Sequence, residues 1–354
     1  MTSRATFALL ALVLVLGACN GAAGGDGTTT TPPPPPTSTT AAVSQPQLIS
    51  YTLGAGNTLA YEIEFEIAID MVVTGDASAL TDGEELPGDL DVIMSGKTTL
   101  TYDIQDGPEP GTYEITITGE FADLAVTGTA DGESVDTETV PELVEMDPLE
   151  VTVVVDSQGR VVGDFDPTAG LMGGSLGAFL PGQGTDLARF VGPPMPEGEV
   201  EVGSTWSETI ETPLFVGDPI TTTITSEVTG IDADGIVQIE TTTVVSEISF
   251  DMGTLLIEMF EAFIPEDASE EEIAQLELLK EELRLIFSID ETADEMVTRF
   301  DPVLGLAVEA VSGGDTRLAM DVNMPDETTG DMVAFSIEMD MSQNVTYRLI
   351  DPSR

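Results

Sequence analysis

The chain has 354 residues, of which 41% are hydrophobic, and it carries 65 Asp and Glu against ten Lys and Arg. Its formal net charge of −55 argues against nucleic acid as a partner and against binding to anionic lipid surfaces through a basic patch. The chain has no histidine and one cysteine, which excludes an intrachain disulfide and the usual nitrogen and sulfur metal ligands, so we expect no metal site and no cofactor.

The acidic residues alternate with hydrophobic ones, which distinguishes this chain from a disordered acidic protein. We interpret the acids as the solvated outer face of an extracellular protein. The alternative is an adaptation to a salty habitat or loose binding of divalent cations.

The first 18 residues have the pattern of a secretory signal peptide. Arg4 supplies the positive charge, and Ala5 to Val15 form an apolar stretch that is too short to span a bilayer. The sequence Leu16-Gly17-Ala18-Cys19 resembles the lipobox of bacterial lipoproteins, and the resemblance implies cleavage before Cys19 and a diacylglycerol on its sulfur. We therefore expect a mature protein that is lipid-anchored to the extracytoplasmic face of the cell membrane through Cys19.

Residues 19–47 are rich in Thr, Pro and Gly and include the run Pro32 to Pro36. Such a segment has little to bury, and a proline run extends by about 3.1 Å per residue. We expect a tether that holds the folded part, residues 48–354, away from the membrane.

The longest alternating pattern lies in Leu59 to Val73, where one parity is apolar and the other is mostly acidic. The apolar residues are Tyr61, Ile63, Phe65, Ile67, Ile69 and Met71. At ~3.3 Å per residue the stretch from Tyr61 to Val73 would be about 43 Å long, so the strand must twist and bend. The pattern predicts a curved antiparallel sheet with one buried face.

Four short matches occur in the same order in the two halves of the folded part. They are Gly56 to Leu59 with Gly203 to Trp206, Thr98 to Thr101 with Thr222 to Thr225, Gly111 with Gly235, and Asp156 to Gly159 with Asp301 to Gly305. We interpret residues 48–192 and 193–354 as two β repeats that form one domain.

The second repeat contains a predicted helical hairpin at residues 253–287. Ser269 and Glu272 match a capping box. Ile273, Leu276, Leu279, Leu283 and Ile286 have helical spacing. A shorter helix from Gly253 to Ile264 is expected to end at Pro265. We interpret the hairpin as a plug against the sheet, with a mobile lid over a cavity as the alternative.

Two further alternating strands are predicted at residues 317–324 and 332–350, and their apolar faces are rich in methionine. The candidate ligand-facing residues here are Met320, Met324, Phe335, Met339 and Met341. Such a face forms an ordinary core, or it suits a variable apolar partner because thioether side chains adapt their shape.

Two short motifs match known catalytic or metal-binding patterns only in part. Gly173 to Gly177 spells the nucleophile elbow of hydrolases around Ser175, but a chain without histidine lacks the general base that this mechanism needs. Asp232 to Gly235 opens like a calcium loop but lacks the later ligands, and it is interpreted as a hairpin turn. No catalytic residue is assigned.

The lipobox, the tether and the proline run Pro193 to Pro196 before Val202 to Trp206 resemble a family of bacterial β-rich lipoproteins of unknown function. This resemblance covers most of residues 48–350 and implies no catalytic residues. More distantly, the architecture is similar to lipoprotein carriers and glycolipid-carrying lipoproteins, whose half-barrel sheets hold acyl chains.

The expected fold is mainly β, a long curved antiparallel sheet of half-barrel or barrel-like form with an inserted helical hairpin. The expected function is non-enzymatic binding of a lipid or other hydrophobic ligand in that sheet. The alternative is a structural or protein-interaction envelope lipoprotein with a packed core and an acidic surface.

Overall fold

The computed structural model describes residues 46–75, 88–136, 149–160, 162, 192–212, 219–251, 253, 284–325 and 332–353. Every element assigned within these ranges is a β-strand. The first seven are β1 (Gln47–Leu48), β2 (Thr58–Gly75), β3 (Asp89–Asp106), β4 (Thr112–Ala130), β5 (Glu133–Asp136), β6 (Leu149–Asp156) and β7 (Glu199–Val200). The others are β8 (Thr205–Thr212), β9 (Ile220–Ile231), β10 (Val237–Val245), β11 (Ile248–Asp251), β12 (Arg284–Ile289), β13 (Thr292–Asp301), β14 (Leu306–Pro325) and β15 (Met332–Ser353).

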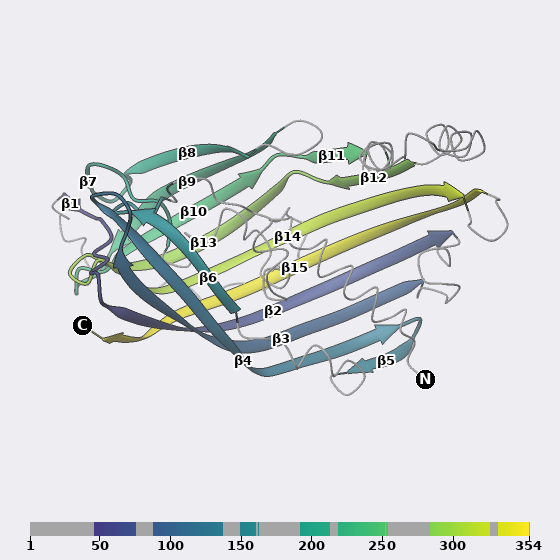
Figure 1. Cartoon of the computed structure of the whole chain (residues 1–354), viewed down its shortest axis with the longest axis horizontal. Helices are drawn as coiled ribbons and strands as arrows, with labels where there is room; N and C mark the ends of the chain where they lie inside the picture. Colours follow the sequence, from purple (N-terminus) through teal and green to yellow (C-terminus); the bar gives the residue numbers. More distant parts are fainter. Residues whose placement is uncertain are drawn as a thin grey trace, which may run out of the picture.

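Thirteen of these strands form one antiparallel sheet (Figure 1). Its main order is β5-β4-β3-β2-β15-β14-β13-β10-β9-β8, with β6 also beside β4, β12 also beside β14, and β11 beside β12. The remaining two strands, β1 and β7, pair with each other. Because β5 and β6 lie at one border and β8 at the other, the sheet is not closed into a barrel. The predicted class, mainly β with a large antiparallel sheet, is confirmed.

The first long strand of the chain pairs with the last one. Residues Thr58 to Gly75 of β2 lie against Phe335 to Ser353 of β15, with one register shift near Leu349. Figure 1 shows β14, β15, β2 and β3 running side by side along the length of the molecule. The strand predicted from Leu59 to Val73 is confirmed and extends slightly beyond both predicted ends.

One face of the sheet carries the core. Along β2 the buried residues are the odd-numbered ones from Leu59 to Met71, as period-two alternation requires. Apolar residues of this face belong to one continuous hydrophobic cluster, to which nearly all strands of the sheet contribute. Burial of apolar side chains stabilises the fold by roughly 25 cal/mol per Å² of apolar surface removed from water.

Strand β4 changes the parity of its buried residues along its length. Ile115 and Ile117 are buried in its first half and Val126 in its second. Between these halves the register against β3 shifts by one residue, and Asp123 has a positive φ of 57°. An extra residue of this kind is a β-bulge, which bends a strand and increases its twist.

The turns before β2 and before β8 share the same backbone bonds. Gly56 N donates to Ile104 O over 2.7 Å, and Gly203 N donates to Val228 O over 2.8 Å. Both glycines have φ near +90°, a region that side chains disfavour. In the sheet, β2-β3-β4-β6 and β8-β9-β10-β13 are each consecutive neighbours. The division into repeats 48–192 and 193–354 stays a prediction.

The prediction of a helical hairpin at residues 253–287 is wrong for its C-terminal end. Residues 284–287 were expected to be helical, but Arg284–Ile289 form β12, which pairs with β11 and β14. The apolar spacing of Leu283 and Ile286 fits a helix, yet the edge of β14 offers unpaired backbone groups that a strand satisfies. Residues 254–283, which hold the rest of the predicted hairpin, lie outside the described residues.

Candidate functional site

The candidate site is the buried face of β2, β15 and β14. Each candidate residue of β2 is at most 5% exposed. These residues are Tyr61, Ile63, Phe65, Ile67, Ile69 and Met71. Because all six share one parity, they line a single apolar stripe along an 18-residue strand.

The structure brings the methionine-rich residues against this stripe. Met339 lies directly opposite Met71, and Met341 lies opposite Ile69. Met320 faces Ile337 across the next pair of strands. Met320, Phe335, Met339 and Met341 are all buried. Met324 belongs to β14, where it pairs with Val333, but its side chain lies outside the described residues.

One end of the sheet is covered by residues 46–57 and 192–204, which we call the end cap. Three backbone amides of the first segment bond to the ends of different strands. Tyr51 N donates to Ser157 O after β6, Thr52 N to Gly305 O between β13 and β14, and Gly56 N to Ile104 O in β3. Figure 1 shows β1 and β7 of the cap at the end where β8, β9 and β10 converge with β4 and β6.

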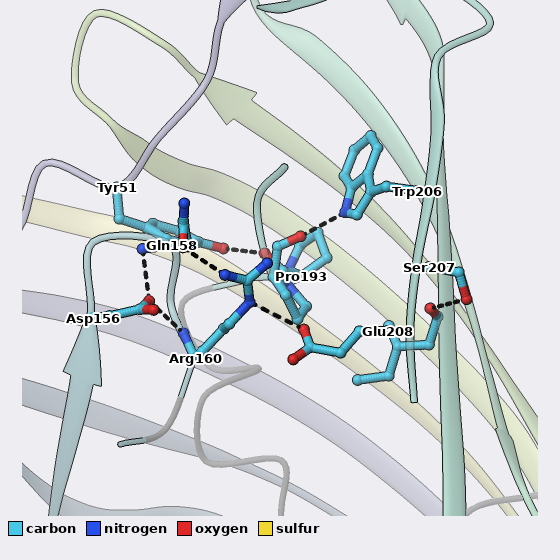
Figure 2. Close-up of polar contacts among 10 residues, drawn as sticks. Tyr51, Asp156, Gln158, Arg160, Pro193, Trp206, Ser207 and Glu208 are labelled. Carbon is cyan, nitrogen blue, oxygen red and sulfur yellow. Dashed lines mark hydrogen bonds and ion pairs between the residues drawn. The ribbon is translucent and has the colours of Figure 1, made fainter. Parts of the chain in front are cut away.

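Two buried tyrosines, Tyr51 of the end cap and Tyr61 of β2, donate their hydroxyls to backbone carbonyls. The Tyr51 hydroxyl donates to Pro193 O over 2.8 Å, and the Tyr51 ring packs edge-on against Phe300 (Figure 2). The Tyr61 hydroxyl donates to Ala307 O over 2.8 Å. Burial raises the pKa of Tyr51 and of Tyr61, and also that of Tyr102, because the phenolate form would lose its hydration.

The two borders of the sheet also meet at this end. Arg160, four residues past β6, forms an ion pair with Glu208 of β8, with Nε 3.3 Å from Oε2 (Figure 2). Trp206 of β8 donates from Nε1 to Pro194 O over 2.7 Å. Asp156 Oδ1 accepts from the amides of Gln158 and Arg160, which fixes the turn that carries the arginine.

A polar part of the buried face was missed at the sequence level. Nine polar or charged residues are buried among those the structure describes, and eight of them lie in β9, β10, β13 and β14. We call six of these the polar patch: Ser226, Thr241, Thr243, Thr292, Asp294 and Thr298. The sequence pattern could have predicted these buried threonines. Threonines of β9 and β10 recur with period two among apolar residues, as Thr241 and Thr243 do after Ile239, which places them on the same face of the strand.

The opposite face of the sheet is exposed and acidic, with a few ion pairs. Lys97 of β3 pairs with Glu64 of β2, and its hydrogen bond and charge lower the pKa of Glu64. Arg317 of β14 pairs with Glu338 of β15 over 2.9 Å. Such exposed pairs contribute about 0–1 kcal/mol each.

The sequence between Asp232 and Gly235 forms the predicted hairpin turn between β9 and β10. Asp232 Oδ1 accepts from the amides of Asp234 and Ile236, and Gly235 has a φ of 86°. The other carboxylate oxygen of Asp232 lies 3.5 Å from Arg299 Nη2. No group of three or more metal-ligating side chains occurs in the described part of the chain.

Two predicted positions cannot be placed. Cys19 and Ser175 lie outside the described residues, so the lipidation site and the nucleophile-like loop stay predictions. Among the residues that are described, no helix is both long and apolar enough to cross a membrane.

No family model matches this chain, and no curated protein matches it either. Among solved structures, an outer membrane channel from Pseudomonas putida F1 is 6% identical over 85% of this chain and 97% of that one, with a TM-score of 0.22. The InvG secretin domain β-barrel from the Salmonella SPI-1 injectisome is 11% identical over 84% and 64%, with a TM-score of 0.15. DynF from the dynemicin biosynthesis pathway of Micromonospora chersina is 9% identical over 88% and 92%, with a TM-score of 0.14.

Proposed function

We propose that this chain is a bacterial lipoprotein, anchored to the extracytoplasmic face of the cell membrane through lipid on Cys19. In this proposal a half-barrel sheet binds a lipid or another hydrophobic molecule and catalyses no reaction. We also infer that its two halves are related repeats, which the shared bonds of Gly56 and Gly203 favour.

The observation that carries the binding proposal is the apolar stripe shared by β2, β15 and β14. Met71 and Met339 face each other within it, and both are buried. A long stripe of aliphatic and thioether side chains matches the shape and polarity of an acyl chain.

A second candidate is an envelope protein with a packed core whose acidic outer surface contacts partner proteins. The low exposure of the stripe favours this alternative, since side chains at most 7% exposed are already covered within the chain. Capture of envelope proteins by the outer face that survives replacement of Met339 or Met341 would support it.

Native mass spectrometry of the full chain, released from membranes in mild detergent, tests the binding proposal. We expect a non-covalent adduct with the mass of a lipid in addition to any covalent modification. A lipid-free protein across a range of detergents and lysis conditions would contradict binding and favour the packed-core candidate.

The anchor has a separate test. In a lipoprotein-processing host, the chain should lose residues 1–18 and gain the mass of diacylglycerol. The Cys19→Ser variant should keep its full length and carry no lipid. An unmodified thiol at position 19 in the mature wild-type protein would contradict the anchor without bearing on ligand binding.

A further inference from the structure

Strand β8 forms one border of the sheet, and its outer edge carries backbone groups that point away from the sheet. Among the described strands it pairs with β9 alone. At the start of this pairing Val228 N donates to Ser204 O. Because bonded and non-bonded residue pairs alternate in an antiparallel ladder, the even-numbered residues from Trp206 to Thr212 bond to β9. The residues whose N–H and C=O groups point outward are Thr205, Ser207, Thr209 and Glu211.

The opposite border of the sheet is less open. After β6 the chain turns back, so that Asp156 N donates to Arg160 O and Val162 N donates to Val154 O over 2.8 Å. The other strand at that border, β5, has only four residues. Natural proteins protect free edges with short strands, covering segments, prolines or lysines. Strand β8 has eight residues without a proline or a lysine, so its edge is a template for an additional strand.

The side chains of β8 indicate what an added strand would contact. Trp206, Glu208 and Ile210 are partly buried on the core face, whereas the odd-numbered side chains are exposed on the outer face. Neighbouring side chains on paired strands have Cβ atoms about 4.5–5.5 Å apart, so they interact directly. An added strand would therefore place apolar residues beside Trp206 and Ile210, and it would meet carboxylates at Glu208 and Glu211.

Charge favours a cationic partner over a second copy of this chain. Two β8 strands paired with each other would bring their glutamates together, and each chain has a net charge of −55. Like charges on paired strands are destabilising. Arg160 already forms an ion pair with Glu208, with Nε 3.3 Å from Oε2. A lysine or arginine of a partner can replace Arg160 at this carboxylate and also pair with Glu211.

We propose that β8 binds an extended cationic segment of a partner protein by strand addition. The segment bonds to the outward N–H and C=O groups of β8, and its lysine or arginine side chains meet Glu208 and Glu211. Its apolar side chains lie beside Trp206 and Ile210. The edge of β8 is separate from the apolar stripe of β2, β15 and β14, so this inference does not depend on lipid binding.

The test titrates the full-length protein at low salt with two synthetic peptides, each eight residues long. The first contains valine, threonine and two lysines that are three positions apart, as Glu208 and Glu211 are. The second has glutamate in place of both lysines. Two signals report binding: the fluorescence of Trp206, which is the only tryptophan of the chain, and amide hydrogen exchange along β8.

A pair of variants at one position separates strand addition from attraction between charges. Thr209→Pro removes an outward N–H and leaves the bonds between β8 and β9 in place, because proline is tolerated at a free edge. The matched control, Thr209→Ala, keeps this N–H. Neither change alters a charge.

We expect the lysine peptide to change the fluorescence of Trp206 and to slow amide exchange in β8 at least about fivefold, with β2 and β15 unchanged. The glutamate peptide should bind at least about tenfold more weakly. Thr209→Pro should weaken binding of the lysine peptide at least about tenfold, and Thr209→Ala less than about twofold.

Three results would overturn this inference. They are unchanged exchange in β8 with the lysine peptide, equal binding of both peptides, and equal binding of the lysine peptide by a folded Thr209→Pro protein and the wild type. The first two are measured on the wild type, so they decide the matter even if Thr209→Pro fails to fold. None of them bears on lipid binding at the apolar stripe.

Discussion

Arg160 and Glu208 join the two borders of an unclosed sheet, with Arg160 Nε 3.3 Å from Glu208 Oε2. The arginine follows β6 at one border, and the glutamate lies in β8 at the other (Figure 2). The pair lies next to the end cap, where Trp206 bonds to Pro194. This end of the molecule is therefore held by side chains and by the cap.

Glu208→Gln should loosen the border without unfolding the protein. Both partners are about one third exposed, so the pair contributes at most about 1 kcal/mol to the free energy of unfolding. We expect faster amide hydrogen exchange in β8 and unchanged exchange in β2 and β15. Glu211→Gln, an exposed change on the same strand, is the control and should leave β8 unaffected. Identical exchange in β8 for both variants would show that Arg160 does not hold this border.

The buried tyrosines should make the protein sensitive to alkali. Burial raises the pKa of Tyr51, Tyr61 and Tyr102, whereas an unfolded tyrosine titrates near pH 10. Above about pH 10 the unfolded chain releases protons that the folded chain keeps. Stability is therefore fully present below pH 10 and is lost as the pH rises, by up to about 1.4 kcal/mol per pH unit for each buried tyrosine.

Urea unfolding between pH 7 and pH 11 measures this loss, and the presence of only two lysines keeps other titrations small. Tyr61→Phe should reduce the loss of unfolding free energy per pH unit by the contribution of one buried tyrosine. It should also lower stability at pH 7 by about 1 kcal/mol, because the bond to Ala307 is lost. If the free energy of unfolding falls with pH equally steeply in Tyr61→Phe and in the wild type, the buried Tyr61 hydroxyl does not contribute to the alkali sensitivity.

Gly128 allows β4 to lie close to β3. A Cβ at this position would be 2.1 Å from Asp91 O and 2.7 Å from Val92 Cα, and backbone atoms cannot move away cheaply. Gly128→Ala should lower the free energy of unfolding by about 1–3 kcal/mol. Gly230→Ala in β9 is the matched control, since its nearest neighbour would be Gln238 Cβ at 4.0 Å. We expect the control to change stability by less than about 1 kcal/mol in chemical denaturation.

Three exposed aspartates stand side by side on the outer face. Asp70 of β2 lies opposite Asp91 of β3 and opposite Asp340 of β15. Like charges directly opposite each other destabilise a sheet, so Asp70→Asn should raise the free energy of unfolding by about 0.2–1 kcal/mol at low salt. Glu66→Gln serves as the control, because Glu66 lies opposite Ser95 and Asn344.

High salt should abolish the gain in unfolding free energy that Asp70→Asn gives at low salt. The reason is screening, since the Debye length falls from about 30 Å at 0.01 M to about 3 Å at 1 M. Thermal melts at both salt concentrations measure this. A gain for Asp70→Asn that is independent of salt would mean that repulsion between these aspartates is not its cause.

The alternation of apolar and polar residues predicted which face of each long strand is buried, but it did not predict which strands pair with each other. In β2 the odd residues from Tyr61 to Met71 are buried as expected. Their pairing with β15 joins residues nearly three hundred positions apart, for example Ile63 with Tyr347, and periodicity carries no information about such contacts. The bulge at Asp123 was equally invisible, because one extra residue reverses parity without a change in composition.

The two other errors have a common physical source in tertiary context. Residues 284–287 have a helix-compatible spacing, but pairing with β14 decides their conformation. The polar patch was overlooked because Thr241 and Thr243 look like ordinary strand threonines, and only the structure shows that they lie on the buried face beside Asp294.

Site-specific photo-crosslinking tests the central claim most directly, with a photoreactive phenylalanine in place of either Met339 or Glu338 in the full-length protein in its membrane. These two neighbours on β15 point to opposite faces, one buried and one exposed. We predict that the probe at position 339 becomes attached to lipid and that the probe at position 338 does not. Attachment at 339 only to other parts of the same chain would contradict ligand binding and establish a packed core.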